Sequence, residues 1–342
     1  MKTLSRKKYL AKKVVFVDGL PGCGKTLFSA LISSMDRVEL LSYAYDVEHT
    51  CSLYFLGKIP MDAAKTMISL QTDLKLYNTM MGRDINFRPT DLSSVIKSCN
   101  PARYFHRLFS PGDEKIPEII RQESPILNLS VHNLLGYSEP IFQALEGRCV
   151  FIEVVRHPLY MVRQQALNMS KLLESVRDFT VYYAYKNREL PYYVNGWENE
   201  YLKSNSMERS IYLIDKLTCQ TEEKNKLREA YQAKIITIPF ELFVKSPEPW
   251  LQKIADALET NVSDDTRRVM SEQNVPREMV ADGLDLEIYK RCGWVPPQKG
   301  TIERDELFIR REDVAREVSS ELLAILDRLS NKYEKKYWNP GA

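Results

Sequence analysis

Hydrophobic residues form two different patterns along the 342-residue chain: short continuous runs and longer stretches with helical spacing. Short continuous runs of β-branched and aromatic residues predict buried strands at 14–18, 38–42, 126–131, 149–155 and 234–238. Apolar residues spaced three and four apart predict helices at 24–34, 60–82, 139–146, 158–174, 206–233, 247–259, 264–274, 276–292 and 312–337. Because strands alternate with helices, we expect an α/β fold with a mainly parallel sheet, helices on both faces and a helical C-terminal part.

One stretch breaks this alternation. Residues 179–203 read FTVYYAYKNRELPYYVNGWENEYLK, which is rich in tyrosine and alternates locally. This pattern predicts an inserted hairpin or flap at about 175–205, within a single domain that spans residues 1–342. Its aromatic side chains suit either stacking on a sugar ring or ordinary hairpin packing, and the sequence leaves both interpretations open.

The composition narrows the class of protein. A net charge of +2 and 44% hydrophobic residues are ordinary for a globular protein, so we expect no nucleic-acid partner and only local basic character, as in the first 13 residues. No apolar run is long enough to predict a membrane span. Six scattered cysteines and four histidines form no CxxC pair or Cys/His cluster. We therefore expect reduced thiols, a cytoplasmic protein and no metal site.

The strongest motif follows the first predicted strand. Residues 19–26 read GLPGCGKT and match the phosphate-loop pattern G-x-x-x-x-G-K-[ST]. In such a loop, glycines let main-chain N–H groups point at a phosphate, and the N-terminus of the next helix adds positive charge. The lysine reaches the outer phosphate, while the threonine holds Mg²⁺ or a further oxygen. The predicted nucleotide-binding residues are Gly19, Gly22, Cys23, Gly24, Lys25 and Thr26.

The phosphate loop alone does not define a reaction, because ATPases, GTPases, kinases and sulfotransferases all use it. The chain has no guanine-recognition motif: its nearest string, residues 331–334 (NKYE), falls in a predicted charged helix. A GTPase is therefore disfavoured. Glu153 stands within a predicted strand rather than at its end, so it does not suit the Mg²⁺-holding acid of an ATPase or kinase.

Two later segments carry a family resemblance. They are VFIEVVRHPLYMVRQQ at 150–165 and IITIPFELFVKSPEPWLQKIADALE at 235–259. With the phosphate loop, they resemble the sulfotransferases that use 3′-phosphoadenosine 5′-phosphosulfate (PAPS). The resemblance implies that the loop grips the 5′-phosphosulfate and that Arg156 binds the 3′-phosphate. It also makes Lys299 and Gly300 candidates for the family's late basic-glycine loop, although an ordinary surface loop fits these two residues equally well.

The chain departs from this family in three places. The family loop carries a cation where Gly22 stands, whereas the cation here is Lys25, as in kinases. The family has a serine eight residues after the arginine; here the residue is Gln164, whose amide can also donate hydrogen bonds to phosphate. The full late R-K-G string is missing. A kinase using ATP and Mg²⁺, or a nucleotide-binding protein without transferase activity, therefore stays open.

Transfer to a hydroxyl group needs a base beside the acceptor oxygen. His132 follows a predicted strand, as in family members with a histidine base, while Asp46 and Glu48 occupy the general region of a glutamate base. With Lys25, these are the predicted catalytic residues; a hydrogen-bonded histidine and a solvated acidic loop are the alternatives. His157, beside Arg156, suits a structural role. The favoured function is sulfuryl transfer from PAPS to a hydroxyl of a glycan or small metabolite.

Overall fold

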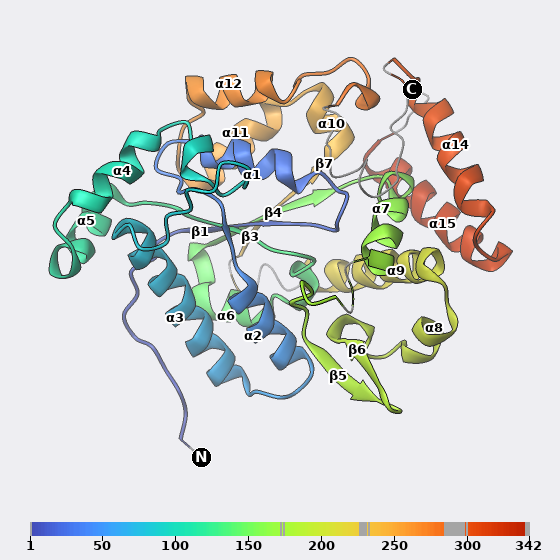
Figure 1. Ribbon diagram of the computed structural model, residues 1–342, viewed down its shortest axis with the longest axis horizontal. Coiled ribbons are helices and arrows are strands. Elements are labelled where there is room, and N and C mark those ends of the chain that lie inside the picture. The colour runs from blue at the N-terminus through green and yellow to red at the C-terminus, as the bar shows by residue number, and fades with distance from the viewer. Residues whose placement is uncertain are drawn as a thin grey trace.

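The computed structural model describes residues 2–171, 173, 175–225, 231, 233–283, 298 and 300–338 (Figure 1). Its centre is a five-stranded parallel sheet in the order β2-β3-β1-β4-β7. The strands are β1 (Val14–Asp18), β2 (Ser42–Tyr43), β3 (Leu127–Ser130), β4 (Cys149–Val155) and β7 (Lys234–Pro239). The predicted α/β fold with a parallel sheet is therefore confirmed.

Helices connect the strands and cover both faces of the sheet (Figure 1). The α-helices are α1 (Lys25–Ser33), α2 (Tyr45–Phe55), α3 (Met61–Met80), α4 (Pro101–Phe109), α5 (Ile116–Glu123), α6 (Glu139–Leu145), α7 (Pro158–Lys171), α8 (Glu198–Lys203), α9 (Ser206–Asn225), α10 (Phe240–Lys245), α11 (Glu248–Leu258), α12 (Asp264–Glu272), α14 (Glu303–Ala315) and α15 (Ser320–Lys336). Short 3-10 helices are η1 (Val95–Lys97), η2 (Asp113–Lys115), η3 (Leu135–Tyr137), η4 (Glu146–Arg148), η5 (Tyr192–Val194) and η6 (Val280–Asp282). None of the helices within the described ranges is long and apolar enough to cross a membrane.

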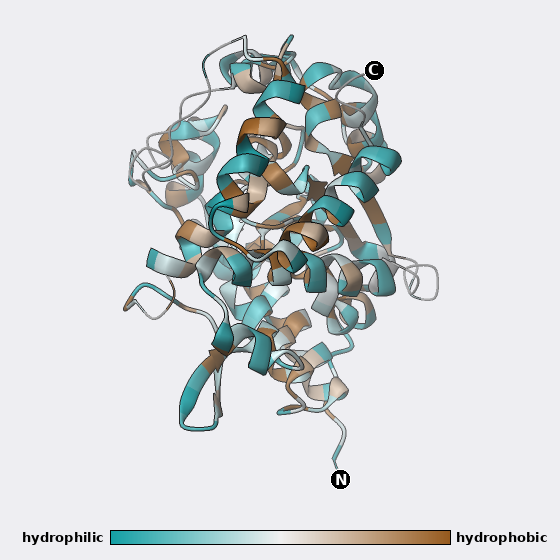
Figure 2. Ribbon diagram, turned by 90° about the vertical axis from the view of Figure 1, so that its right-hand side faces the viewer, coloured by the Kyte–Doolittle hydropathy of each residue, from teal (hydrophilic) through white to brown (hydrophobic). Residues whose placement is uncertain are grey.

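Strand β1 shows how the sheet divides the interior into two cores. Because side chains alternate along a strand, Val15 and Val17 pack with residues of α1, α7, α10 and α11. Val14 and Phe16 pack on the other face with residues of α2, α3 and α6. Figure 2 shows the matching pattern on the helices, in which hydrophobic and hydrophilic stretches alternate. The result is the expected three-layer α/β/α arrangement.

The tyrosine-rich stretch forms the predicted hairpin. Strands β5 (Tyr182–Tyr185) and β6 (Arg188–Pro191) are antiparallel, and the two turn residues between them have φ angles of 45° and 61°. Two successive positive φ angles are typical of a type I′ hairpin turn. Beyond the hairpin, Tyr192, Trp197 and Tyr201 are buried in the second core. Much of the aromatic group therefore packs the interior.

Three predicted elements differ from the structure. The strand at 38–42 is reduced to an isolated bridge at Val38 and the two-residue β2, because the Leu40 N–H donates to the hydroxyl of Tyr104 rather than to a neighbouring strand. The helix expected at 312–337 is two helices, α14 and α15, because the Ser319 hydroxyl accepts the Leu322 N–H and caps a new start. The expected acidic loop around 46–48 is helix α2.

Two further predictions fall partly outside the described residues. The helix at 206–233 is observed as α9 up to residue 225. Of the helix at 276–292, the described part holds only η6, and residues 284–292 lie outside the described ranges. Lys299, a predicted donor-binding residue, also lies outside them. Because β1, β3, β4 and β7 are parallel, their C-terminal ends meet at one edge of the sheet, where the phosphate loop lies.

Candidate functional site

The phosphate loop has the backbone that its glycines predict. Gly19, Gly22 and Gly24 all have positive φ angles, of 146°, 89° and 100°. A Cβ atom at Gly24 would also lie only 2.2 Å from the ring of Phe240. Both the backbone angle and this close approach exclude a larger residue at position 24. Gly24 is the N-cap of α1, so the free main-chain N–H groups at that helix start belong to the loop.

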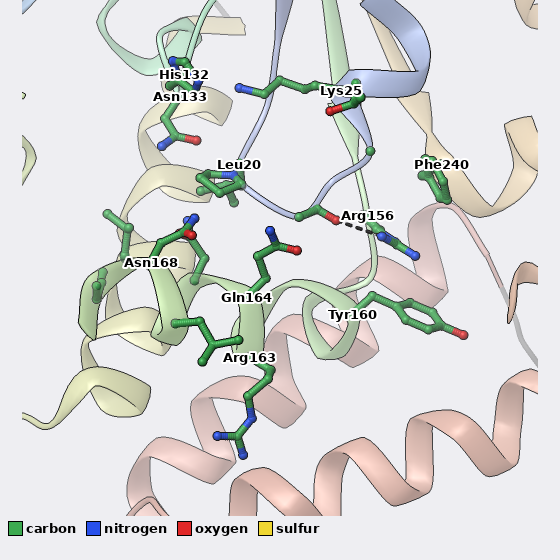
Figure 3. Close-up of a pocket in the computed structure, with 18 of the residues that line it drawn as sticks. Leu20, Lys25, His132, Asn133, Arg156, Tyr160, Arg163, Gln164, Asn168 and Phe240 are labelled. Atoms are coloured by element: carbon green, nitrogen blue, oxygen red, sulfur yellow. Dashed lines mark hydrogen bonds between the residues drawn. The ribbon is translucent and has the colours of Figure 1, made fainter. Parts of the chain in front are cut away.

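A cavity of about 690 Å³ opens beside the loop. Its walls come from α2, the end of β3, the strand-end turn after β4, α7 and the segment around η6. Figure 3 shows that Gln164 and Asn168 project from α7 toward the loop. The predicted residues that line the cavity are Gly22, Gly24, Lys25, Thr26, Glu48, His132, Arg156 and Gln164. Those that do not line it, among the described residues, are Gly19, Cys23, Asp46 and Gly300.

Lys25 extends from the loop toward the end of β3 (Figure 3). Its Nζ atom donates a hydrogen bond to the main-chain carbonyl of Val131 at 2.5 Å. The ammonium group therefore stands next to His132, the following residue. One positive charge thus lies between the phosphate loop and the predicted base.

Two of the three predicted bases, Glu48 and His132, are hydrogen-bonded to each other. Oε1 of Glu48 accepts the main-chain N–H of His132 at 2.9 Å and lies 3.1 Å from its Nδ1. A carboxylate only accepts, so Nδ1 donates to it, and in the neutral imidazole the lone pair is then on Nε2. Since 37% of the His132 side chain is exposed, this lone pair is accessible from the cavity.

Aromatic rings fix the plane of the histidine. The rings of Tyr43 and Tyr45 lie nearly parallel to that of His132, with interplanar angles of 7° and 18°. Phe179 meets Tyr45 edge to face, and its carbonyl oxygen lies 2.7 Å from Nε2 of His49. This part of the cavity therefore has aromatic walls close to His132.

Arg156 stands where the sequence resemblance placed it, just after β4. It donates from Nη1 to the carbonyl of Gly22 at 2.9 Å, which is the dashed line in Figure 3. Its guanidinium carbon lies 4.4 Å from the ring centre of Phe240 and 4.8 Å from that of Tyr160. Nε is buried without a hydrogen-bond partner in the described part of the chain, but it forms an ion pair with the buried carboxylate of Glu241 at 3.7 Å. Arg156 is thus a restrained cation with unused hydrogen-bonding capacity.

A second arginine, Arg277, comes from the segment before η6 and lies near Arg156: the guanidinium carbons of Arg277 and Arg156 are 5.8 and 4.4 Å from the ring centre of Phe240. Burial and the charge of Arg156 lower the pKa of Arg277 to about 10. Its guanidinium donates to main-chain carbonyls of residues 273, 274 and 280, and it forms no ion pair with a described carboxylate. Two neighbouring cations that repel each other form a natural site for an anion. The sequence pattern did not indicate Arg277, because it lies in no motif and within an expected helix.

Two other arginines that line the cavity are already paired. Arg163 binds Asp313 and Glu317, and Arg310 binds Glu306 through two nitrogen atoms. The hydroxyl of Tyr160 also donates to Glu306. The Arg163 ion pairs and the Tyr160 hydrogen bond connect α7 to α14 and to Glu317 just beyond it, whereas Arg310 and Glu306 both lie on α14. Among the described residues, Arg277 has no ion pair and Arg156 has only the one with Glu241, so both retain more capacity for an incoming anion than Arg163 and Arg310 do.

The remaining predicted residues lie apart from this site. Asp46 faces Lys75 at 4.0 Å, and α2 places it away from the cavity lining. His157 is fully buried and contacts Glu334 through Nε2, which agrees with the structural role expected for it. Gly300 donates its N–H to Asp282. Burial raises the pKa of the Cys23 thiol to about 11, so Cys23 is a packing residue behind the loop.

Two acids on the central strands, one at the end of β1 and one within β4, are engaged in the fold. Asp18, at the end of β1, accepts the main-chain N–H groups of Leu134 and Leu135 at 3.1 and 2.7 Å. Glu153 accepts the hydroxyl of Thr237 at 2.5 Å and faces a smaller pocket of about 120 Å³ behind the loop. No group of three or more His, Cys, Asp or Glu side chains within the described ranges is arranged to hold a metal ion.

No protein-family model and no curated protein sequence matches the chain. Its structure is similar to solved sulfotransferase structures. The sulfotransferase domain of the olefin synthase of Synechococcus PCC 7002 has 12% identity and a TM-score of 0.45, covering 97% of this chain and 98% of that one. The sulfotransferase domain of the curacin biosynthetic pathway has 12% identity and a TM-score of 0.47, covering 93% and 97%. Sulfotransferase STF9 from Mycobacterium avium has 11% identity and a TM-score of 0.44, covering 96% and 77%.

These neighbours belong to the class that the sequence resemblance predicted. Their TM-scores all lie below 0.5, so the likeness carries no argument about activity or substrate. The function proposed below is therefore argued from the side chains of the cavity.

Proposed function

We propose that the protein transfers a sulfuryl group from PAPS to a hydroxyl acceptor. The observation that carries this proposal is that two separate groups of residues able to bind phosphate line one cavity. The first is the phosphate loop with Lys25, and the second is the Arg156–Arg277 pair. PAPS carries phosphate at both its 5′ and 3′ positions, whereas ATP carries none at the 3′ position.

Each residue then has a defined task. Main-chain N–H groups of the loop and the Lys25 ammonium hold the 5′ phosphosulfate, and the positive charge stabilises the leaving phosphate oxygen. Arg156 and Arg277 bind the 3′-phosphate with charge-assisted hydrogen bonds. Nε2 of His132 accepts the proton of the acceptor hydroxyl, and Glu48 stabilises the imidazolium that forms. The donor supplies the sulfuryl group.

Two alternatives remain as outcomes of the experiment. A kinase would hold Mg²⁺ with Thr26 and a strand-end carboxylate, but Asp18 and Glu153 are both engaged elsewhere. A nucleotide-binding protein without transferase activity would not need a base. The Glu48–His132 pair beside Lys25 favours catalysis over that alternative.

Transfer of label from ³⁵S-PAPS to a pool of sugars, small alcohols and phenols tests the proposal. The wild-type protein is expected to label at least one acceptor and release 3′-phosphoadenosine 5′-phosphate (PAP) in equal amount. His132→Ala is expected to reduce the rate by about 10²- to 10⁴-fold, the usual contribution of a general base. His106→Ala provides a matched control, because His106 is exposed on α4, outside the cavity. Label transfer that survives in His132→Ala would remove His132 as the base.

A further inference from the structure

A basic segment, residues 2–13, runs beside helix α3 (Figure 1). The N–H of Leu4 donates to Asp62 at 2.8 Å, near the start of α3. Nε of Arg6 donates to Asp73 at 2.8 Å, and two more main-chain N–H groups of the segment donate to the same carboxylate. The segment is thus held at two points along the helix, at 62 and 73.

This segment contains six lysine and arginine residues and no acidic residue. Arg6 pairs with Asp73, and Lys13 pairs with Glu259. The other four are exposed and form no ion pair with any residue that the structure describes; they are Lys2, Lys7, Lys8 and Lys12. Although the whole chain carries a net charge of only +2, this side of the molecule therefore bears concentrated positive charge.

An apolar stripe lies next to the basic segment on α3. Met67, Leu70 and Leu74 are 44%, 41% and 59% exposed, and their spacing of three and four residues places them on one face of the helix. At 100° per residue, this face begins about 60° from Asp73, which anchors the segment. Two apolar residues of the segment itself, Leu4 and Tyr9, are also more than half exposed. Basic and apolar side chains thus share one surface.

We propose that this surface, formed by residues 2–13 and the α3 stripe, binds peripherally to an anionic lipid bilayer. Lysine ammonium groups reach lipid phosphates while leucine and methionine side chains enter the boundary between headgroups and acyl chains. A nucleic acid would use the lysines but leave the stripe in water, so the combination favours a membrane. This inference is independent of the proposed enzymatic function, because none of these residues lines the cavity.

Helix α14 provides a matched apolar control. Phe308 and Ile309 are 65% and 62% exposed there, and the two arginines that follow them in the chain are paired with Glu306 and Asp327. Figure 1 shows α14 on the opposite side of the molecule from the N-terminus and α3. If exposed apolar side chains alone caused lipid binding, replacing Phe308 and Ile309 would weaken vesicle binding as much as replacing Leu70 and Leu74.

Co-sedimentation of the full chain with phosphatidylcholine vesicles, with and without phosphatidylserine, tests the proposal. Binding is expected only with phosphatidylserine and is expected to weaken as salt screens the charges. Lys7→Gln with Lys8→Gln should lower the partition coefficient about 10- to 30-fold, given a contribution of about 1 kcal/mol from each lysine. Leu70→Gln with Leu74→Gln should also weaken binding. Phe308→Gln with Ile309→Gln, and the charge control Lys253→Gln with Lys335→Gln, should bind like the wild type.

Three results would overturn the proposal. One is equal sedimentation with both kinds of vesicle, and another is full binding by the Lys7/Lys8 or Leu70/Leu74 variants. The third is tight binding of single-stranded RNA that depends on the lysines, combined with no vesicle binding. All the substituted side chains are exposed. The melting temperature of each variant is compared with that of the wild type. Where it is unchanged, a loss of vesicle binding is due to the substituted surface side chains and not to unfolding.

Discussion

At the scale of single residues, one carboxylate organises the proposed base. Oε1 of Glu48 accepts one hydrogen bond from the main-chain N–H of His132 and another from its Nδ1–H. The same oxygen therefore sets the position, the orientation and the tautomer of the imidazole. Asp46, two residues earlier, was an equal candidate in the sequence. The helix that carries both acids separates them: Glu48 lines the cavity and Asp46 does not.

Replacing each acid with its amide distinguishes their roles. Glu48→Gln is expected to reduce the rate of sulfuryl transfer about 10²-fold, because the amide can donate to Nδ1 and favour the wrong tautomer. PAP binding should be retained, since Glu48 does not contact the Arg156–Arg277 pair. Asp46→Asn should leave both quantities unchanged. Steady-state rates and PAP affinities of the two variants check this, and equal rates in both would remove Glu48 from the mechanism.

The cysteines provide a test of burial at the phosphate loop. Burial raises the pKa of Cys23 to about 11, so its thiolate, the reactive form, is scarce at pH 8. Cys219 is exposed. Iodoacetamide at pH 8 is expected to modify Cys219 well before Cys23, with the rate at Cys23 rising as the pH approaches 11. Mass spectrometry of the tryptic peptides measures the order. Early modification of Cys23 would contradict the packed loop.

At the scale of elements, the sequence pattern predicted the inner sheet well and the edges poorly. The bounds of β1 and β4 agree with the prediction because continuous β-branched runs leave no other buried arrangement. β2 is short because the Leu40 N–H donates to the hydroxyl of Tyr104 on α4, so the ladder that Glu39 still forms with Ile126 is interrupted there. The break between α14 and α15 depends on a single capping serine, Ser319, within a continuous helical pattern.

The ion pairs between Glu39 and the arginines of α4 are expected to contribute strongly to the free energy of unfolding. Glu39 is fully buried and contacts Arg107 through two hydrogen bonds, with Arg103 as a third donor. Glu39→Ala leaves Arg107 buried without its partner, which typically costs about 3–5 kcal/mol. Urea unfolding measures this loss. Glu123→Ala is the matched control, because Glu123 is half exposed and lies 3.8 Å from the same arginine, and its loss should be about 1 kcal/mol or less.

At the scale of the whole molecule, four strand ends and one late segment build the cavity. The phosphate loop follows β1, His132 follows β3, Arg156 follows β4 and Phe240 follows β7. Ligands of parallel sheets bind at this edge, so the sequence motifs identified these positions. Arg277 comes from a segment without a motif, and only the fold reveals that it lies near Arg156. A tertiary pair of this kind leaves no local signal in the sequence.

Arg156 and Arg277 form the proposed 3′-phosphate site. Calorimetric titration of the protein with PAP, and with ADP plus Mg²⁺ at the same salt concentration, tests it most directly. We predict that PAP binds without metal and more tightly than ADP. Arg156→Ala should weaken PAP binding about 10- to 100-fold, the usual loss for a charge-assisted hydrogen bond to phosphate. Metal-dependent ADP binding with no preference for PAP, unaffected by Arg156→Ala, would contradict the account and indicate an ATP site.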